Sequence, residues 1–113
     1  MKITYRKDSP ELSVSHNPLI KKHLLVDSAQ IDHITNFSRA VFPPGEVAPG
    51  HSHPDMTEVF YIESGSAEMV VDGERISLPV GSCIVIEPGE THELRNIGND
   101  EMAVVYLGVL TNS

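Results

Sequence analysis

Turn-forming residues recur at short intervals through the second half of this chain, and they constrain its fold more than any other feature. The turn segments are Pro43-Pro44-Gly45, Ser64-Gly65, Asp72-Gly73, Pro79-Val80-Gly81, Pro88-Gly89 and Gly98-Asn99-Asp100. Asp72-Gly73 strongly indicates a hairpin, because a two-residue primed turn needs positive φ angles. Many short strands separated by such turns are typical of a β-sandwich or β-barrel, and no segment reads as a convincing helix.

The segments between these turns are the expected strands. They comprise residues 37–42, 58–63, 67–71, 75–78, 82–86, 92–96 and 102–110, and the last is the most apolar and is expected to be central. Residues 21–26 predict one further strand, residues 1–18 an arm or an edge strand, and residues 27–36 have no clear assignment. Strand alternation places Phe60 and Ile62 on the face of Glu58, with Tyr61 on the opposite face.

Chain length and cysteine content limit the class of protein. A chain of 113 residues is expected to form one domain that buries about two thirds of its unfolded surface. No stretch is long and apolar enough to span a membrane, and the N-terminal residues lack the apolar core of a secretion signal. The single Cys83 excludes an internal disulfide and fits a reducing cytosol, so we expect a cytoplasmic protein.

The net charge of −8 is concentrated in the second part of the chain. Residues 45–113 hold two of the 8 Lys and Arg residues but twelve of the 16 Asp and Glu residues. An acidic body repels phosphate backbones, so no nucleic-acid partner is expected. A solvated acidic surface that aids solubility is the favoured interpretation, and an acidic rim that gathers metal cations or disfavours anionic substrates is the alternative.

Three histidines and one glutamate carry the most distinctive chemistry of the sequence. His51, His53 and Glu58 lie in one run, and His92 follows the turn at residues 87–91. His51 and His53 are two positions apart, so their side chains point to the same face of a strand. Glu58 is an odd number of positions beyond His53, but the segment 54–57 breaks the strand and lets the chain re-enter the sheet with Glu58 facing inward.

These four side chains predict a site for one divalent transition metal ion. Three imidazole nitrogens and one carboxylate oxygen leave positions open on a six-coordinate ion, which suits Fe, Mn, Ni or Co and also admits Cu or Zn. Taken singly, each residue reads as an ordinary polar side chain at a strand end. Taken together at these spacings, they favour metal binding.

The same residues resemble the two sequence motifs of the cupin family. The first motif, Gly-x5-His-x-His-x4-Glu-x6-Gly, is matched at every spacing by Gly45, His51, His53, Glu58 and Gly65. The second motif, Gly-x5-Pro-x-Gly-x2-His-x3-Asn, is matched by Gly81, Gly89, His92 and Asn96, with Glu87 in place of the motif's proline and Pro88 next to it. The resemblance covers about residues 37–110.

The resemblance implies a fold, a ligand set and an assembly. It implies a small all-β, antiparallel double-stranded β-helix or jelly-roll barrel, with residues 1–113 as a single cupin domain. Residues 1–36 would form an N-terminal arm and edge strands, and residues 37–110 the barrel. The metal would lie near one mouth, held by His51, His53, Glu58 and His92. Similar cupins commonly pair through their N-terminal strands and sheet edges, so residues 1–26 predict an exchange arm in a homodimer.

Residues outside the metal site receive other assignments. Tyr61, Tyr106 and Arg39 are candidates for the substrate pocket, and Arg39 would anchor a carboxylate if it faces inward. Met69 and Met102 are candidates for pocket walls, and Met56 for filling a packing gap. We expect Cys83 as a small buried side chain, Asn96 as a bridge to backbone near His92, His16, His23 and His33 at the surface, and Gly45, Gly65, Gly81 and Gly89 at turns with unusual φ.

Three classes of function remain open, each with a small-molecule ligand or substrate. The first is a metal-dependent dioxygenase, which the resemblance favours slightly. The second is a non-redox metal enzyme such as a sugar isomerase, an epimerase or a decarboxylase, in which the metal polarises a carbonyl or carboxylate. The third is a non-catalytic module that binds a metal or a small ligand. No residue outside the metal site decides among them.

Overall fold

The computed structural model describes residues 1–111, which form ten β-strands and one short 3-10 turn, η1 (Arg6–Asp8). The strands are β1 (Glu11–Val14), β2 (Asn17–Val26), β3 (Ile34–Phe42), β4 (Val47–His51), β5 (Met56–Ser64), β6 (Ala67–Val71), β7 (Glu74–Leu78), β8 (Cys83–Ile86), β9 (His92–Asn96) and β10 (Met102–Leu110). No α-helix occurs in the described chain. Correspondingly, none of its helical residues form a segment with the length and hydropathy needed to cross a membrane.

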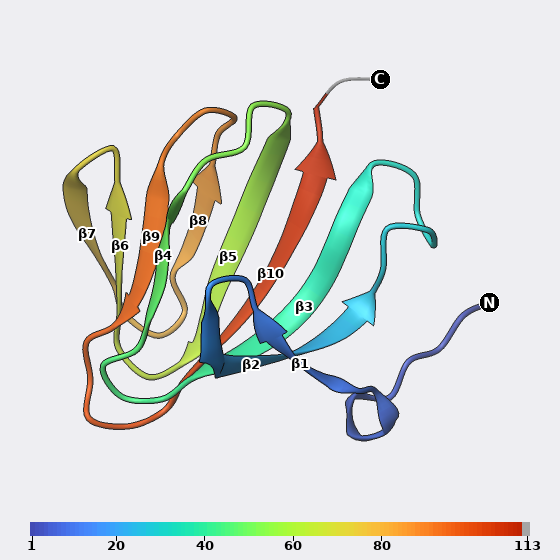
Figure 1. Ribbon diagram of the computed structural model, residues 1–113, viewed down its shortest axis with the longest axis horizontal. Coiled ribbons are helices and arrows are strands. Elements are labelled where there is room, and N and C mark those ends of the chain that lie inside the picture. The colour runs from blue at the N-terminus through green and yellow to red at the C-terminus, as the bar shows by residue number, and fades with distance from the viewer. Residues whose placement is uncertain (112–113) are drawn as a thin grey trace.

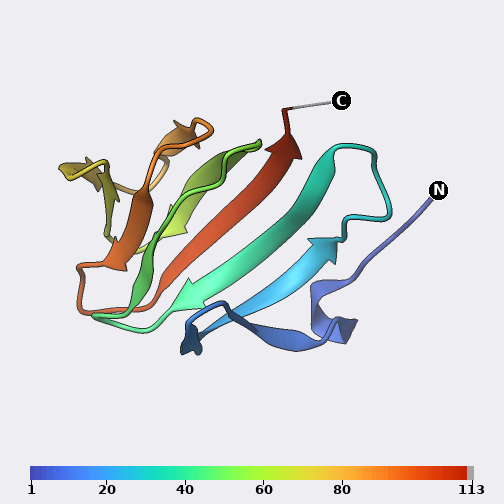
Figure 2. The same cartoon turned by 45° about the horizontal axis from the view of Figure 1, so that its top comes forward.

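The strands form two antiparallel sheets (Figure 1). The larger has six strands in the order β1-β2-β3-β10-β5-β8, and the smaller has four in the order β4-β9-β6-β7. The turned view in Figure 2 shows β3 and β10 side by side in the larger sheet, with β1 and β2 along its margin. The all-β fold expected from the turn spacing and the antiparallel jelly roll that the resemblance implied are therefore confirmed, and β10 is an interior strand as expected.

Alternating side chains on both sheets build one apolar core between them. On β5, Phe60 and Ile62 are buried, whereas Tyr61 between them is exposed. This confirms the parity assigned from the sequence, since successive side chains of a strand point to opposite faces. The remaining core residues come from both sheets and comprise Ile20, Ala40, Phe42, Ala67, Met69, Leu78, Ile86, Leu94, Met102 and Val104.

The turns follow the residue types that predicted them. Asp72 and Gly73 have φ angles of 48° and 85° and join β6 to β7, as the two-residue hairpin requires. Gly65 has φ of 89°, and a Cβ atom placed on it would lie 2.8 Å from the Cα atom of Met102. Gly65 therefore satisfies two requirements at once, a left-handed backbone and a close approach to β10.

Several expected boundaries and environments need correction. β5 begins at Met56 rather than Glu58, because Met56 and Thr57 already pair with the end of β10. β3 begins at Ile34, within the segment that had no assignment. Cys83 is exposed rather than buried, because it pairs with Tyr61 and shares its outward face.

The N-terminal residues lie within the larger sheet. β1 and β2 form an antiparallel hairpin, and β2 pairs with β3. Asn17, at the start of β2, donates hydrogen bonds from its Nδ2 atom to Glu46 Oε1 at 3.1 Å and to the Val47 carbonyl at 2.8 Å. These bonds fasten the tip of the hairpin to the start of β4 in the smaller sheet.

Candidate metal centre

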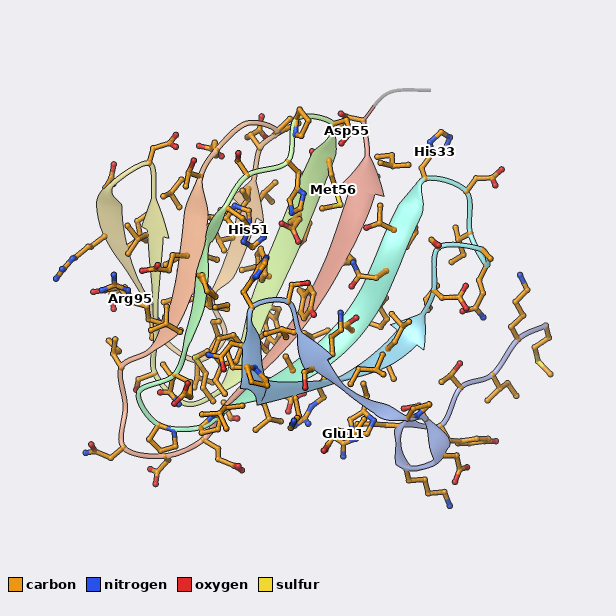
Figure 3. All side chains as sticks on the ribbon, viewed as in Figure 1. Glu11, His33, His51, Asp55, Met56 and Arg95 are labelled. Carbon is orange, nitrogen blue, oxygen red and sulfur yellow. The ribbon has the colours of Figure 1, made fainter. Side chains whose placement is uncertain are left out.

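The four predicted ligands come from both sheets and from the loop between them. His51 ends β4 and is paired across the smaller sheet with His92, which begins β9. Glu58 lies on β5 of the larger sheet, and His53 lies in the connection from β4 to β5. His53 therefore lies on a loop. It does not share an unbroken strand with His51, although the spacing of the two residues had predicted that it would. Figure 3 shows His51 and Met56 beside this connection.

The three imidazoles converge on one carboxylate oxygen. Glu58 Oε1 lies 2.9 Å from His92 Nε2, 3.5 Å from His53 Nε2 and 3.9 Å from His51 Nε2. His51, Glu58 and His92 form the tightest group, with their ligand atoms all within 4.8 Å of one another, and His53 is not part of that group. The structure thus brings all four predicted residues to one place and places three of them closest together.

The protonation of two imidazoles follows from their other ring nitrogen. His51 Nδ1 lies 2.9 Å from the Pro49 carbonyl oxygen, and His92 Nδ1 lies 3.1 Å from the Glu90 carbonyl oxygen. A carbonyl oxygen can only accept, so each Nδ1 carries the hydrogen and donates it. In a neutral imidazole the Nε2 atom then presents a lone pair, and such backbone contacts are how metal-binding histidines are oriented.

The buried atoms of this cluster are complementary to a cation. The side chains of His92 and Glu58 are only 3% and 8% exposed, and neither His92 Nε2 nor Glu58 Oε1 has a hydrogen-bond partner, although they face each other at 2.9 Å. Two buried acceptors in such proximity are unfavourable unless a positive charge lies between them. A divalent metal ion bound by imidazole nitrogens and a carboxylate satisfies both atoms, so the residues fit the implied group.

The electrostatics of His92 agree with that reading. Burial of the imidazole lowers the pKa of His92. The Glu58 carboxylate, which accepts a hydrogen bond from Nε2 once that atom is protonated, and the hydrogen bond to the Glu90 carbonyl together raise it more, so the pKa lies above its ordinary value. The centre therefore attracts positive charge, whether a proton or a metal ion supplies it.

A cavity of about 480 Å³ opens beside the cluster. Its apolar wall includes Phe42, Phe60, Leu94 and Val104 from both sheets. The Phe60 ring lies 5.9 Å from the His92 ring and stacks on Tyr106 at 5.6 Å. A volume of this size suits a small organic molecule.

Tyr106 is the one proposed pocket tyrosine that lines the cavity. It lies on β10, and burial, more than the nearby charge of Glu58, raises the pKa of Tyr106 to about 12. The phenol therefore keeps its proton at neutral pH and can donate a hydrogen bond to a ligand. Tyr61 does not line the cavity, since its side chain is on the outer face and 45% exposed.

The predicted role of Arg39 as a pocket anchor is wrong. Its guanidinium lies on the outer face of the larger sheet and binds Glu63, with Nη2 to Oε2 at 2.6 Å and Nε to Oε1 at 3.1 Å. The hydrogen bond to Glu63 raises the pKa of Arg39 and lowers that of Glu63. The reason is parity, because Ala40 rather than Arg39 occupies the inward position of β3.

The environments of the methionines differ from those expected, and one of the remaining histidines also lines the cavity. Met56 lines the cavity, whereas Met69 and Met102 are fully buried in the core behind it. His23 accepts or donates a hydrogen bond with Ser9 at 2.9 Å, as a surface histidine should, and His33 is exposed. His16 also is exposed but lines the cavity at the tip of the β1–β2 hairpin.

Asn96 bridges backbone, as expected from its place in the second motif. Its Nδ2 atom donates to the carbonyls of Phe42, Pro43 and Asp100 at 2.9 to 3.1 Å, and its Oδ1 atom accepts from the Gly98 amide at 3.0 Å. The side chain is buried, so it ties the end of β9 to the end of β3 without touching the metal cluster.

Sequence reasoning missed Lys22, a half-buried lysine of β2 that lines the cavity. Strand alternation could have identified it. Ile20, Lys22 and Leu24 occupy alternate positions of one strand, so they share a face, and Ile20 on that face is fully buried. A lysine between two apolar residues of one face is an inward-facing charge. Asn36 on β3 was also missed, because the segment that contains it had no assignment.

Comparison with known proteins places the chain in a wider context. A family model described as the cupin domain matches residues 38–108. An oxalate-binding protein of Thermotoga maritima is 27% identical over 88 residues, which are 78% of this chain and 73% of that protein. Gentisate 1,2 dioxygenase 1 of Aquipseudomonas alcaligenes is 37% identical over 59 residues, which are 52% of this chain and only 17% of the dioxygenase.

The fold recurs in solved structures. The crystal structure of a predicted oxalate decarboxylase from Thermotoga maritima superposes with a TM-score of 0.86 at 21% identity, covering 97% of this chain and 99% of that one. At this level of identity the similarity establishes a shared fold and does not extend to activity.

Proposed function

This chain belongs to the cupin domain family, and from that premise we propose that it is a metal-dependent enzyme acting on a small organic substrate. The metal would be one divalent transition ion held by His51, His53, Glu58 and His92. The observation that carries the proposal is the facing pair of buried acceptors without hydrogen-bond partners, His92 Nε2 and Glu58 Oε1, in the wall of a cavity that suits a small molecule.

The chain's own residues have distinct parts in this proposal. His51 and His92 present Nε2 lone pairs because their Nδ1 atoms donate to backbone carbonyls. Phe60 and its apolar neighbours exclude water from the substrate, and Tyr106 donates a hydrogen bond while keeping its proton. When bound, a transition metal supplies Lewis-acid polarisation and, for redox-active ions, oxygen chemistry.

Dioxygenase-like chemistry is the favoured reaction class. Apart from the four metal-binding residues, the titratable groups that line the cavity within residues 1–111 are His16, Lys22 and Tyr106. Because its pKa is raised, Tyr106 keeps its proton at neutral pH and is not available as a general base, which gives less support to an isomerase that needs a base beside the metal. The match to a gentisate dioxygenase supports the oxygen-using class, although this chain spans only a sixth of that enzyme.

A metal-dependent decarboxylase or carboxylate-binding protein is the second candidate. It is supported by the similarity to the Thermotoga oxalate-binding protein, which extends over most of both chains. Both candidates use the same metal centre, so they differ in the substrate and in whether oxygen is consumed.

Metal content and turnover together test the proposal. Untagged protein, purified without chelator or a nickel column, is expected to contain near-stoichiometric metal by elemental analysis. His92→Ala should lose it, whereas His23→Ala, which alters a surface histidine outside the cavity, should retain it. Oxygen consumption with a panel of diketones, flavonols or thiols would support the dioxygenase. Release of carbon dioxide from oxalate or a 2-oxo acid without stoichiometric oxygen uptake would support the decarboxylase.

Protein that neither contains nor takes up metal would overturn both candidates.

We further propose that the protein is a cytoplasmic, single-domain homodimer that pairs through its N-terminal strands. Within the described residues 1–111, eleven large apolar side chains are exposed, and five of them belong to residues 1–19: Met1, Ile3, Tyr5, Leu12 and Leu19. A concentration of exposed apolar surface on one segment is typical of a protein interface. β1 is also an edge strand of the larger sheet, with one side free to pair.

A further inference from the structure

Lys22 points to the chemical class of the ligand. We infer that the substrate carries an anionic group, a carboxylate or an equivalent, at the end remote from the metal, and that Lys22 binds it. This inference rests on the proposed function, since it concerns a ligand of the same cavity. It adds a specificity-determining residue and a substrate class that the metal centre alone does not specify.

The first argument is the charge inventory of the cavity. Among the residues that line it, Glu58 is the sole acid, and Lys22 stands with three histidines of the metal cluster and His16. A divalent ion at the cluster would more than neutralise Glu58. The cavity is therefore positive inside a chain whose net charge is −8, and a positive, low-dielectric cavity favours an anion.

The second argument is the contrast between two adjacent lysines. Lys21 is exposed and donates a hydrogen bond to Ser13 Oγ at 3.1 Å. Lys22 is half-buried against the cavity and forms no ion pair or side-chain hydrogen bond within residues 1–111. Lys22 therefore lines the cavity without an anionic partner in the described chain, and an anionic group of a ligand would give its ammonium the ion pair that the protein does not supply.

The third argument is the position of Lys22 relative to the metal. Lys22 pairs with Ala40, Ala40 with Val104, and Val104 with Ile62, so Lys22 lies in the cross-strand row of Ile62. Glu58 is four residues along β5 from Ile62, which is roughly 13 Å along the strand, and β2 is three strand spacings from β5, roughly 14 Å across the sheet. The two charges therefore lie toward different ends of the cavity, and a ligand that meets both is elongated.

The cavity wall between the metal cluster and Lys22 offers mainly apolar contacts and one hydrogen-bond donor, which suits an elongated ligand. Phe60 and Val104 provide apolar contacts, and Tyr106 lies between the rows of Lys22 and Glu58. Its phenol donates a hydrogen bond along that route. The arrangement fits a chain or ring with oxygen at the metal end, an apolar middle and a negative charge at the Lys22 end.

Calorimetric titration with dicarboxylates of increasing length tests the inference. The protein as purified is titrated with oxalate, succinate and adipate, and with adipamide, the neutral diamide of adipate. Lys22→Met keeps the apolar stem of the side chain and should weaken adipate binding about tenfold or more, because a hydrogen-bonded ion pair is lost. Lys22→Arg should recover most of the affinity. Lys21→Met is the matched control for charge and strand propensity and should bind adipate as the wild type does.

The outcomes separate Lys22 from the metal centre. Oxalate affinity should be the same in Lys22→Met and in the wild type, because the short dianion contacts the metal end alone. Equal adipate affinity in the two proteins, an equal loss of adipamide binding, or no dicarboxylate binding to the wild type would each overturn the inference. Protein that neither contains nor takes up metal but still binds adipate through Lys22 would refute the proposed metal enzyme and support the anion site.

Thermal unfolding gives a second readout that needs no ligand. Loss of an ammonium that has no ion-pair partner in the described chain should leave the melting temperature of ligand-free Lys22→Met unchanged or higher than that of the wild type. A residue retained for packing would instead lower the melting temperature when altered. A marked decrease in Lys22→Met with no decrease in Lys21→Met would therefore contradict the assignment of Lys22 to ligand binding.

Discussion

The role of an individual side chain in this protein depends on the groups that surround it in the fold. Glu58 and Glu63 lie five residues apart on β5, so their side chains point to opposite faces of the sheet. Glu58 faces the cavity and Glu63 faces the solvent. Glu58 is buried among imidazoles, whereas Glu63 binds the Arg39 guanidinium on the outer face. The same carboxylate chemistry thus supplies a metal ligand at one position and a surface ion pair at the other.

The Arg39–Glu63 ion pair should contribute a small, pH-dependent stability. The hydrogen bond from Arg39 holds the pKa of Glu63 below its ordinary value, so the contribution is present above the ordinary glutamate pKa and is lost as the pH falls through the lower folded value. Because Glu63 is 41% exposed, solvent screening limits the effect, and Glu63→Gln should cost less than about 1 kcal/mol at pH 7.

Denaturant unfolding of Glu63→Gln and the wild type at pH 7 and pH 3 measures this contribution. The difference between them should shrink at the lower pH. Glu74→Gln, which alters an exposed glutamate of β7 without an ion pair in the described chain, is the control and should show little difference at either pH. A Glu63→Gln deficit that grows at low pH would contradict the assigned direction of the pKa shift.

Asn96 should be among the most sensitive polar residues outside the metal cluster. Its buried amide satisfies three carbonyls and one amide of the backbone, so Asn96→Ala leaves several of them unpaired. We expect a loss of about 2–4 kcal/mol in the free energy of unfolding, measured by chemical denaturation. Asn99→Ala changes an exposed asparagine three residues away and should be nearly neutral. Equal losses in the two variants would show that the buried hydrogen bonds contribute nothing specific.

At the scale of strands and turns, backbone geometry decides which residues are interchangeable. Gly65 and Gly73 both have positive φ, of 89° and 85°. They differ in their surroundings, since a Cβ atom on Gly65 would meet the backbone of Met102, whereas a Cβ atom on Gly73 would meet nothing within 4 Å. The pair therefore separates the conformational requirement from the packing requirement.

Alanine substitutions at these two glycines should differ in severity. Gly73→Ala should cost about 1–2 kcal/mol, which is the penalty for a side chain in the left-handed region. Gly65→Ala adds displacement of β10 and should cost clearly more. Urea unfolding of both variants provides the measurement. Equal costs would mean that the approach of Gly65 to Met102 relaxes freely.

At the scale of the whole molecule, the two sheets and the N-terminal strands form one assembly around the cavity. The smaller sheet supplies His51 and His92, the larger supplies Glu58, and the β1–β2 hairpin places His16 at the cavity margin. The cavity therefore depends on contacts between segments far apart in the sequence. Of the exposed large apolar side chains in the described chain, five lie within residues 1–19.

The proposed homodimer is tested by its mass in solution. Sedimentation at micromolar concentration should give twice the 12.4 kDa chain mass. Replacing exposed Leu12 and Leu19 of β1 and β2 together by lysine should yield monomers, because two charges would be buried in the interface. Val80→Lys alters an exposed valine in the turn before β8 and should remain dimeric. A monomeric wild type would refute the proposed assembly.

Local patterns in the sequence determined the fold class, most strand positions and the four candidate metal ligands. Turn residues act over a few positions, strand alternation has a fixed period of two, and motif spacing is a local property, so each can be read along the chain. The hairpin at Asp72-Gly73, the outward Tyr61 and the backbone bridge of Asn96 all followed from such local information.

Only the tertiary structure decided which faces meet and what lies between them. The pairing of His51 with His92 joins residues from different motifs, and the inward face of β2 is defined by its pairing with β3. Without that register, Arg39 was kept as a candidate pocket residue and Lys22 was overlooked. The physical reason is that a shift of one residue in strand pairing exchanges the inner and outer faces, and pairing depends on contacts across the whole chain.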